Sequence, residues 1–395
     1  RYWNGVLTML KPDALVFSDV PHMAFRFIAY RLAKQRGITC LMLRNTRVAG
    51  RMFIIDDHLY YKKLENQIEA NRGKNFTLDD VSPDVRDHYE KQRSLDKSPW
   101  FFHRNYIDAK TYGLYRFLPS IQSIKKNLKE LTFLKTVYLY IRMLFMKKSI
   151  PSLEKFDVPI WKIKLQERGF HKMKEKFKRE YMGLVTKPDF SKKYIYVTLH
   201  YQPERSTSVD GGIFVDQILM IDMLSYVAPP DWLIYVKENP LQWGMPRAQV
   251  GRFKGYTEEI IKNKNVRVMP PDTSTFDLIR NAKAVASVTG TAPWEAVLRG
   301  KPALMFGYTW SMYCDGIFPI RDLESCTKAI EKIAQGYTPD QQKIINYLKA
   351  FDESTIFGYQ DRRFRDLDDL NITFVKKDED NIKSVADGFY KELVG

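Results

Sequence analysis

Residues 284–307 read AVASVTGTAPWEAVLRGKPALMFG, and this stretch decides the fold more than any other part of the chain. It opens with an apolar, β-branched run typical of a buried strand, which ends in the small polar residues SVTGT at 287–291. Pro293 favours the first turn of a helix, and the Arg-Gly pair at 299–300 favours its end, before a second apolar strand over 303–306. A strand, a polar loop, a helix and another strand form one unit of a parallel α/β sheet.

The same stretch has features of a ligand site. Glu295 falls in the first turn of the predicted helix, where the helix dipole favours a carboxylate and a bound hydroxyl or phosphate can be held nearby. Backbone N–H groups in such a loop can bind anions. A tight turn at Gly290 and Thr291 explains the same residues without any ligand, so this stretch alone leaves both interpretations open.

Composition indicates a folded chain with anionic partners. The 395 residues are 44% hydrophobic and 14% aromatic, which suffices for the buried cores of two or three domains. The formal net charge of +16 favours nucleic acid, anionic lipid, or phosphorylated and acidic small molecules. Three scattered cysteines (Cys40, Cys314 and Cys326) argue for a reducing compartment and against a disulfide framework or a cysteine-based zinc site.

Two basic stretches, 128–149 and 162–182, interleave Lys and Arg with Leu, Phe, Tyr and Met. Their spacing predicts amphipathic helices that either lie on an anionic membrane surface or form the solvated face of a domain. The most apolar run, 131–146, contains Lys135 and Arg142 and is too short to span a bilayer. With no signal peptide evident either, we expect a cytoplasmic protein that can be peripheral at the inner membrane.

The N-terminal half begins with an α/β pattern. A helix is predicted over 1–11, a strand over 14–19, a helix over 23–37 and a strand over 38–45, which together contain a βαβ unit. The isolated first helix suggests that further strands of this domain come from upstream of the first residue or from elsewhere in the chain. Residues 60–110 carry Pro, Asp and Ser breaks and predict helical insertions and loops at the domain edge.

The C-terminal half predicts repeated βα units. Its expected strands lie within residues 192–204, 231–240, 265–274 and 284–288, and its expected helices within 215–228 and 275–283. The strands end in polar clusters, so we expect a doubly wound sheet with a site at the carboxyl ends of its strands. Three strand ends then converge on one crevice. The residues they supply are His200, Gln202, Glu204 and the loop 205–212, then Lys237, Glu238 and Asn239, then Ser287, Thr289, Gly290, Thr291 and Glu295.

These residues resemble the bacterial capsule-polysaccharide synthesis glycosyltransferases, including the retaining β-Kdo transferases. The resemblance covers about residues 190–325. It rests on LHYQPE with a Gly-rich loop and Asp216-Gln217, on Lys237-x-x-Pro240, on Pro-Pro-Asp at 270–272, and on SVTGTAPWEAVLRGKPALMFG at 287–307. It implies an α/β fold of GT-B type, with two Rossmann-like domains, helical insertions and a nucleotide-sugar cleft between the domains.

The resemblance also implies a division of the chain into three parts. Residues 1–185 would form the acceptor-side domain with its basic helical insertion, and residues 186–350 the domain that binds the nucleotide sugar. Residues 351–395 would form a helical segment that packs back across both domains. One departure concerns the donor phosphate: family members often have His-Pro where this chain has Asn239-Pro240. Phosphate binding would then depend on Lys237, His200 or the 289–291 loop.

Two carboxylates are candidates for the chemistry. Glycosyl transfer passes through an oxocarbenium-like state, so a carboxylate near the anomeric carbon can act as base or as nucleophile. Glu204 is the first candidate because a loop begins there at a strand end, and Asp210 is the second. The resemblance implies a nucleophile and a covalent glycosyl-enzyme, a role that Glu204 would fill by position. Alternatively, Glu204 pairs with Arg205 or caps the next helix.

The remaining candidates bind substrate. By resemblance, Glu295 would hold the ribose hydroxyls, while Ser287, Thr289 and Thr291 would meet the phosphate or the nucleoside. Acceptor contacts are expected from the strand ends of the N-terminal domain. These candidates are Asp19, His22 and Arg44, with Asn45 and Arg47 beside them. No metal site and no cofactor are expected, since the acidic pairs lack the context of a divalent-ion motif.

The leading hypothesis is therefore a glycosyltransferase of capsule or lipopolysaccharide synthesis that moves a sugar from a nucleotide donor to an oligosaccharide or glycolipid acceptor. CMP-Kdo is the expected donor by resemblance. A second hypothesis changes the donor to CMP-sialic acid or a UDP- or GDP-sugar, with Glu204 as the base of an inverting reaction. A third, from another class, is a basic nucleic-acid-binding protein.

Overall fold

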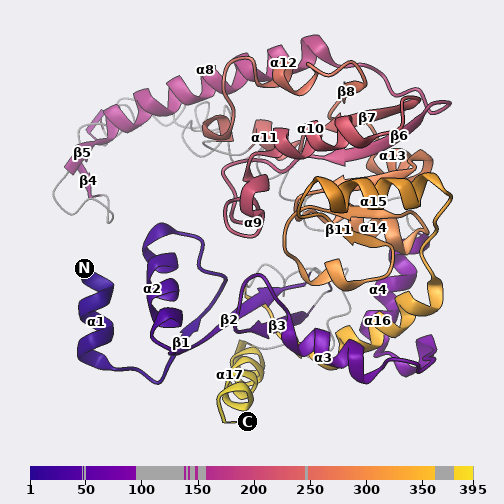
Figure 1. Cartoon of the computed structure of the whole chain (residues 1–395). Coiled ribbons are helices and arrows are strands. Elements are labelled where there is room, and N and C mark those ends of the chain that lie inside the picture. The colour runs from indigo at the N-terminus through magenta and orange to yellow at the C-terminus, as the bar shows by residue number, and fades with distance from the viewer. Residues whose placement is uncertain are drawn as a thin grey trace, which may run out of the picture.

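The computed structural model describes residues 1–46, 48, 50–94, 138, 141–142, 147–149, 157–244, 248–360 and 378–394. Two sheets dominate this part of the chain, one of six strands and one of four (Figure 1). The expected α/β fold with two Rossmann-like domains is confirmed, and each domain has a distinct strand pattern that positions the site.

The six-stranded sheet belongs to the C-terminal half and is parallel throughout. Its strands are β6 (Lys193–Thr198), β7 (Trp232–Lys237), β8 (Val266–Met269), β9 (Ala284–Ser287), β10 (Ala303–Met305) and β11 (Ile317–Pro319). Their spatial order is β11-β10-β9-β6-β7-β8, which is the doubly wound order with its reversal between β6 and β9. A ligand crevice is expected at that reversal.

Helices cover both faces of this sheet. On one face lie α10 (Gln217–Val227), α12 (Tyr256–Ile260) and α15 (Leu323–Ala334), and on the other lie α13 (Thr275–Asn281) and α14 (Ala292–Leu298). Alternate residues of β6 serve the two cores: Ile195 and Val197 pack with α10, whereas Tyr194 and Tyr196 pack on the side of α13 and α14. Strands buried on both faces explain the continuous apolar runs in the sequence.

The four-stranded sheet has the order β1-β2-β3-β12. Its strands are β1 (Ala14–Phe17), β2 (Thr39–Asn45), β3 (Arg51–Ile55) and β12 (Ile356–Phe357). The predicted βαβ unit is present, since α2 (Ala24–Gln35) joins the parallel strands β1 and β2. The sequence analysis missed β3 and β12, which pair antiparallel. The additional strands thus come from a hairpin after β2 and from residues 356–357.

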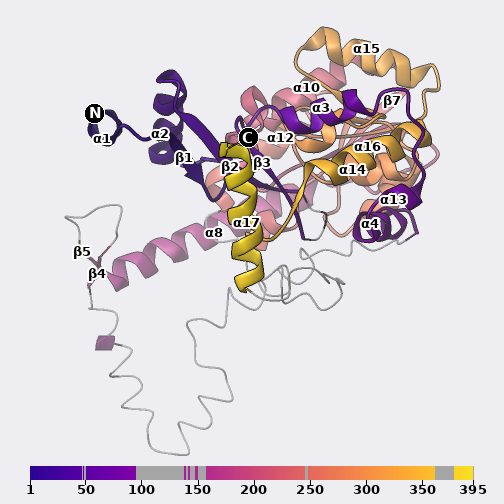
Figure 2. The same ribbon diagram turned by 90° about the horizontal axis from the view of Figure 1, so that it is seen from below.

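Chain segments from both ends pack together around the smaller sheet. The helices here are α3 (Lys62–Ala70), α4 (Pro83–Ser94), α16 (Gln341–Ser354) and α17 (Asp378–Val394). Helix α16 packs on α3, and α17 packs against β3 and β12 (Figure 2). Arg51 binds both Asp84 of α4, at 2.7 Å, and Asp352 of α16, at 2.9 Å. Residues 341–357 therefore return to the N-terminal sheet.

Several shorter elements complete the described chain. They are α1 (Tyr2–Leu10), β4 (Lys147–Ser149), β5 (Asp157–Pro159), α9 (Arg205–Ser208), α11 (Leu241–Gly244), and the 3-10 turns η1 (Leu78–Asp80), η2 (Gly212–Val215), η3 (Ala248–Gly251) and η4 (Trp310–Tyr313).

The second predicted basic helix is present as α8 (Ile160–Leu184), whose C-terminal half is anchored by the buried Phe177 and Tyr181. The first basic stretch lies largely outside the described residues. Within the described ranges, no helix combines the length and the apolar character needed to cross a bilayer.

Candidate functional site

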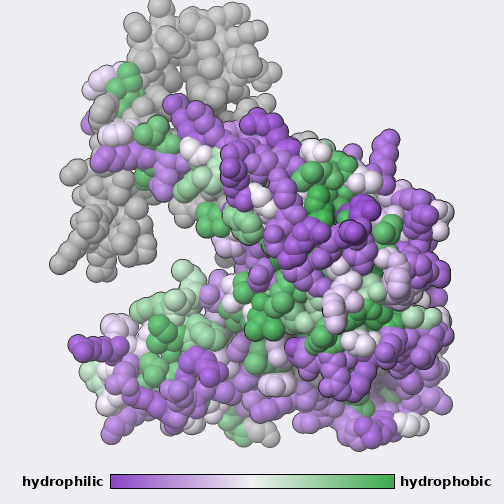
Figure 3. Space-filling model, turned by 45° about the horizontal axis from the view of Figure 1, so that its top comes forward, coloured by the Kyte–Doolittle hydropathy of each residue, from purple (hydrophilic) through white to green (hydrophobic). Residues whose placement is uncertain are grey.

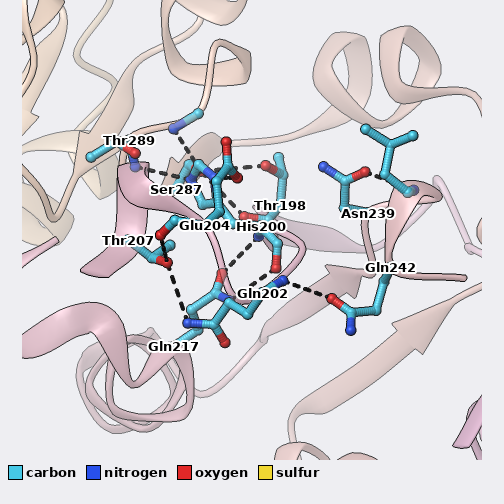
Figure 4. Close-up of polar contacts among 12 residues, drawn as sticks. Thr198, His200, Gln202, Glu204, Thr207, Gln217, Asn239, Gln242, Ser287 and Thr289 are labelled. Carbon is cyan, nitrogen blue, oxygen red and sulfur yellow. Dashed lines mark hydrogen bonds and ion pairs between the residues drawn. The ribbon is translucent and has the colours of Figure 1, made fainter. Parts of the chain in front are cut away.

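The candidate site lies where the strand order of the large sheet reverses. Strand β6 leads into residues 199–204, and β9 leads into the loop 288–291 before α14. Because β6 and β9 are parallel neighbours, both loops leave the same edge of the sheet. Figure 4 shows His200 and Glu204 from the first loop facing Ser287 and Thr289 from the second. The structure thus brings together two of the three predicted strand ends.

His200 is at the centre of this arrangement. The backbone N–H of Thr289 donates to His200 Nε2 at 3.1 Å, and Ser287 Oγ lies 3.4 Å from the same nitrogen. A nitrogen that accepts from a backbone N–H carries no proton of its own, so the neutral ring has its proton on Nδ1. His200 Nδ1 faces Glu204 Oε2 at 3.6 Å. The imidazole therefore links the Thr289 backbone to the Glu204 carboxylate.

The backbone of His200 is also held by hydrogen bonds. Gln217, the first residue of α10, accepts from the His200 N–H at 2.7 Å and donates to the His200 carbonyl at 3.1 Å. Arg252 Nη2 donates to the same carbonyl at 3.1 Å. These bonds hold the backbone of His200, and the Thr289 N–H holds its buried ring.

Several backbone N–H groups and side chains of the 287–291 loop already have hydrogen-bond partners in the protein. Gly290 N–H donates to Ser287 Oγ at 3.2 Å, and a Cβ at Gly290 would stand 2.6 Å from that oxygen, so only glycine fits. The N–H of Thr289 is taken by His200. Thr291 precedes α14 and hydrogen-bonds the Glu295 side chain. The loop's first N–H groups therefore shape the site, and an anion would have to compete for them.

The second predicted strand end contributes a polar cluster around Lys237. Lys237 Nζ donates to the Thr273 carbonyl at 2.8 Å and to Thr275 Oγ1 at 2.7 Å. Burial lowers the pKa of Lys237 to about 8, against the opposing influence of Asp272 and Glu295. Burial likewise raises the pKa of Glu295, against its contacts with Thr291, Arg299 and Lys237. Lys237 and Glu295 thus share one buried environment.

Asn239 and Gln202 shape the loops around the site. Asn239 Oδ1 accepts from the N–H of Leu241 at 3.0 Å, at the start of α11. Gln202 Nε2 donates to the Val215 carbonyl at 2.8 Å, and Gln202 Oε1 accepts from Arg252 Nη1 at 3.1 Å. These bonds hold the loop after β6 in place.

Sequence reasoning missed the ion pair beneath this loop. Arg252 binds Glu238 through two bonds, Nε to Oε2 at 2.9 Å and Nη2 to Oε1 at 2.8 Å, and both side chains are buried. The same guanidinium bonds His200 and Gln202, and its carbon lies 4.4 Å from the centre of the Tyr256 ring. Glu238 was visible as a strand-end carboxylate, but nothing local in the sequence identifies Arg252 as its partner.

Asp210 and Arg44, predicted as catalytic and acceptor residues respectively, bind each other. Arg44 lies in β2, and its Nη1 donates to Asp210 Oδ2 at 2.5 Å, across the two domains. The Asp210 side chain has no exposed surface, and Oδ1 has no hydrogen-bond partner among the described residues. Burial would lower the pKa of Arg44, but Asp210, with Tyr61 and Asp19, raises it. Asp210 is therefore placed as a partner of Arg44 in this structure.

The other predicted acceptor residues lie near the end of β1. Asp19 Oδ1 accepts from the N–H of Val20 at 2.8 Å, and His22 Nδ1 lies 3.0 Å from the Val20 carbonyl, so both shape a turn. Asn45 donates to Gln360 at 2.6 Å. Arg47 lies outside the described residues. His58, which the sequence analysis did not select, is buried beside Asp57, Asp210 and Arg44, and burial lowers its pKa.

Among the described residues, no group of three or more His, Cys, Asp or Glu side chains could hold a metal ion. Of the two candidate carboxylates, Asp210 binds Arg44 through one oxygen, and Glu204 lies 3.6 Å from His200 Nδ1. What the arrangement offers chemically is a partly exposed carboxylate, Glu204, beside a histidine nitrogen at the carboxyl edge of the sheet.

A doubly wound sheet with a polar cluster at its strand reversal, beside a second α/β domain, is the architecture expected for a GT-B fold. The family comparison agrees: the model for "capsule polysaccharide biosynthesis protein" matches residues 118–319. The chain belongs to this family. Membership bears out the expected glycosyltransferase of capsule polysaccharide biosynthesis.

Solved structures give weaker likenesses. The β-Kdo 2,7 transferase of KpsC from Thermosulfurimonas dismutans has 11% identity and a TM-score of 0.38, covering 90% of this chain and 82% of that one. The β-Kdo 2,4 transferase of the same KpsC has 15% identity and a TM-score of 0.33, covering 85% and 87%. UDP-GlcNAc 2-epimerase from Methanocaldococcus jannaschii has 16% identity and a TM-score of 0.30, covering 87% and 76%. A comparison with curated sequences gives no match. At these TM-scores the likenesses do not bear on what the chain binds.

Proposed function

We propose that this chain transfers a sugar from a nucleotide donor to a glycan or glycolipid acceptor during the synthesis of a bacterial surface polysaccharide, with Glu204 as the catalytic carboxylate. CMP-Kdo is the proposed donor, on the resemblance given by the sequence motifs. The observation that carries the proposal is the Glu204–His200–Thr289 arrangement at the strand reversal. It presents a carboxylate at the edge where a doubly wound sheet binds its ligand.

In the proposed retaining reaction, a Glu204 oxygen bonds to the anomeric carbon while the bond from that carbon to the donor phosphate breaks. The nucleotide leaves with the electron pair. An acceptor hydroxyl then attacks the same carbon, the bond to Glu204 breaks, and the hydroxyl proton passes to a base or to water. A nucleophilic carboxylate has to be ionised. His200 Nδ1 lies 3.6 Å from Oε2 and so stands beside the carboxylate that would react.

His200 is thereby proposed as a positioning residue for Glu204. The bond from Thr289 occupies its Nε2, so the ring cannot present that nitrogen to a phosphate without breaking a backbone contact. Lys237 and Glu295 are proposed for the donor phosphate and the ribose hydroxyls. Arg44, with Asp19 and His22, is proposed for the acceptor side, at the strand ends of the smaller sheet.

A donor screen tests the function directly. The protein is incubated with CMP-Kdo, CMP-sialic acid, and UDP- and GDP-sugars, and nucleotide release is measured for each. Turnover of CMP-Kdo supports the proposal. Turnover of another donor alone selects the second hypothesis, in which Glu204 takes the acceptor proton in an inverting reaction. If none of these donors is bound or turned over, the transferase proposal is rejected.

The role of Glu204 has its own test. Glu204→Gln keeps the size of the side chain but removes the charge, and we expect nucleotide release to fall at least about a hundredfold, within the usual range for a catalytic carboxylate. Glu331→Gln, on α15, is the matched control and should be unchanged. A sugar trapped on the Glu204 peptide and detected by mass spectrometry supports retention. Full activity of Glu204→Gln removes this residue from the mechanism.

A further inference from the structure

The first 36 residues form a lobe with an unusual amount of exposed apolar surface. Helix α1 has the apolar residues Tyr2, Trp3, Val6, Leu7, Met9 and Leu10, but Leu7 is the one that is buried. A helix that is apolar on most sides is normally buried in a core or a membrane. Here α1 packs on α2 and stands away from the large sheet (Figure 1).

The exposed side chains of the two helices converge. Tyr2, Met9 and Leu10 of α1 are 66%, 75% and 65% exposed, and Phe25 and Ile28 of α2 are 56% and 52% exposed. The rings of Tyr2 and Trp3 lie 5.6 Å and 4.9 Å from that of Phe25, so the two helices present one aromatic cluster. We name these five exposed residues the α1–α2 patch. In Figure 3 apolar side chains stand among charged ones on this projecting lobe.

The charges around the patch are mainly positive. Residues 1–36 contain Arg1, Lys11, Arg26, Arg31, Lys34 and Arg36 against Asp13 and Asp19. Arg36 donates to Asn4 and Thr8 of α1 and so holds that helix against α2. Arg1, Lys11, Arg26 and Arg31 are exposed. Exposed aromatic and aliphatic groups with a cationic rim are the pattern of a surface that lies on anionic lipid.

Helix α8, which the sequence suggested for this role, has a different distribution. Its exposed Trp161, Leu165, Met173 and Met182 cover about half of the helix circumference at 100° per residue, and Glu175 lies among them. On α1 and α2, by contrast, the rings of Tyr2, Trp3 and Phe25 contact one another across the two helices. We propose that the α1–α2 patch is a docking surface for an anionic phospholipid bilayer. This inference goes beyond the proposed function and needs no assumption about the donor or acceptor.

Vesicle binding tests the inference without any activity measurement. The protein is sedimented with vesicles of phosphatidylglycerol and phosphatidylcholine in equal parts, and with phosphatidylcholine alone. We expect binding to the anionic vesicles, weakened by salt. The test variant is Met9→Ser with Phe25→Ser and Ile28→Ser, and we expect its partition to fall at least about tenfold. The matched control is Tyr226→Ser with Ile382→Ser and Val394→Ser, three equally exposed residues elsewhere.

A second pair of variants tests the charges. Lys11→Glu with Arg26→Glu should lower partition about tenfold or more, whereas Lys192→Glu with Lys254→Glu should change it much less. Equal melting temperatures and nucleotide release exclude unfolding as the cause. Absence of wild-type binding to anionic vesicles, or full binding by the serine variant, overturns the inference. A further outcome is that the wild type binds no vesicles but forms a concentration-dependent dimer, which the serine variant loses. The patch would then be a contact between two copies, and the lipid inference would be overturned.

Discussion

Two buried arginine–carboxylate pairs in this molecule differ in how completely they are satisfied. Glu238 and Arg252 lie within the C-terminal domain, bind through two hydrogen bonds, and share further bonds with His200 and Gln202. Asp210 and Arg44 connect the two domains through one bond of 2.5 Å, and the second oxygen of Asp210 has no partner among the described residues. Both pairs are nearly inaccessible to solvent.

The difference indicates different roles. A buried charge is stable only when its partners satisfy its hydrogen-bonding groups. The Glu238–Arg252 pair meets this condition, so we interpret it as part of the scaffold that shapes the loop after β6. The Asp210–Arg44 pair leaves one acceptor unsatisfied and joins elements that belong to separate sheets. Such a contact can exchange its partner when the domains move or a ligand arrives. The following predictions test this contrast, beginning with the largest effect.

Arg252→Met should be the most damaging change. It leaves Glu238 buried with no cation and removes the donors to the His200 carbonyl and the Gln202 amide. We expect the free energy of unfolding to fall by about 3–5 kcal/mol, measured by urea denaturation. Adding Glu238→Leu should recover much of that loss, because no charge is then buried alone. A loss below about 1 kcal/mol for Arg252→Met would show that this pair is not part of the scaffold.

A second contact between the domains is an uncharged hydrogen bond, and we expect its contribution to stability to depend on pH. Trp294 Nε1 of α14 donates to His88 Nε2 of α4 at 3.1 Å, and burial lowers the pKa of His88 to about 4. The folded state therefore favours neutral His88. The contribution of neutral His88 to the free energy of unfolding is fully present above the ordinary histidine pKa of 6.5. It is lost as the pH falls toward 4, and the loss is at most about 3 kcal/mol.

The pH dependence of unfolding measures this contribution. His88→Gln can still accept from Trp294 but does not titrate, so its stability should vary less between pH 7 and pH 4 than that of the wild type. An unchanged slope in His88→Gln would contradict the assignment.

Arg44→Met should cost less than Arg252→Met. It removes one hydrogen bond from Asp210 and leaves that buried carboxylate without a cation, so we expect a loss of about 3 kcal/mol, the lower end of the range for a broken buried pair. Asp210→Asn should partly restore stability in the Arg44→Met background, since the buried carboxylate charge is gone. If Arg44→Met costs as much as Arg252→Met, then the two pairs are equally structural and the contrast between them fails.

The smallest effect concerns the buried Lys237 and Glu295, a pair without a direct hydrogen bond in the structure. The pKa of Lys237 is lowered to about 8, so its charge is lost as the pH rises through 8. If Lys237 meets the donor phosphate, CMP affinity should fall about tenfold between pH 7 and pH 9 in a fluorescence titration. Lys237→Gln should bind weakly at both values. A flat wild-type profile would remove Lys237 from the donor site.

The sequence predicted several helices and strands correctly where residues close together in the chain determine the local structure. Pro293 and Gly300 bound the predicted helix after β9, and α14 runs from Ala292 to Leu298. The helix predicted over 23–37 is α2, and the strand predicted within 231–240 is β7. Strand β3 was missed, because its pairing with β2 and β12 depends on residues that are distant along the chain or follow a turn.

The candidate site shows the same division. Selecting His200, Glu204, Ser287 and Thr289 required only that polar residues follow parallel strands. Their grouping then follows from the doubly wound order. Their roles did not follow from the sequence. His200 was expected at the donor phosphate, yet in the structure the Thr289 N–H occupies its Nε2 and its Nδ1 faces Glu204. The donor role of His200 stays a prediction that the structure does not support.

By itself, the sequence determined the α/β class, the βα units and the edge of the sheet where polar residues gather, since periodicity, helix caps and strand ends are encoded within a few residues of one another. Only the tertiary structure decided the charge partners: Arg44 with Asp210 across 166 positions, His88 with Trp294 across 206, and Glu238 with Arg252 across 14. A buried charge selects its partner by proximity in space, and that proximity exists only after the sheets have formed and packed.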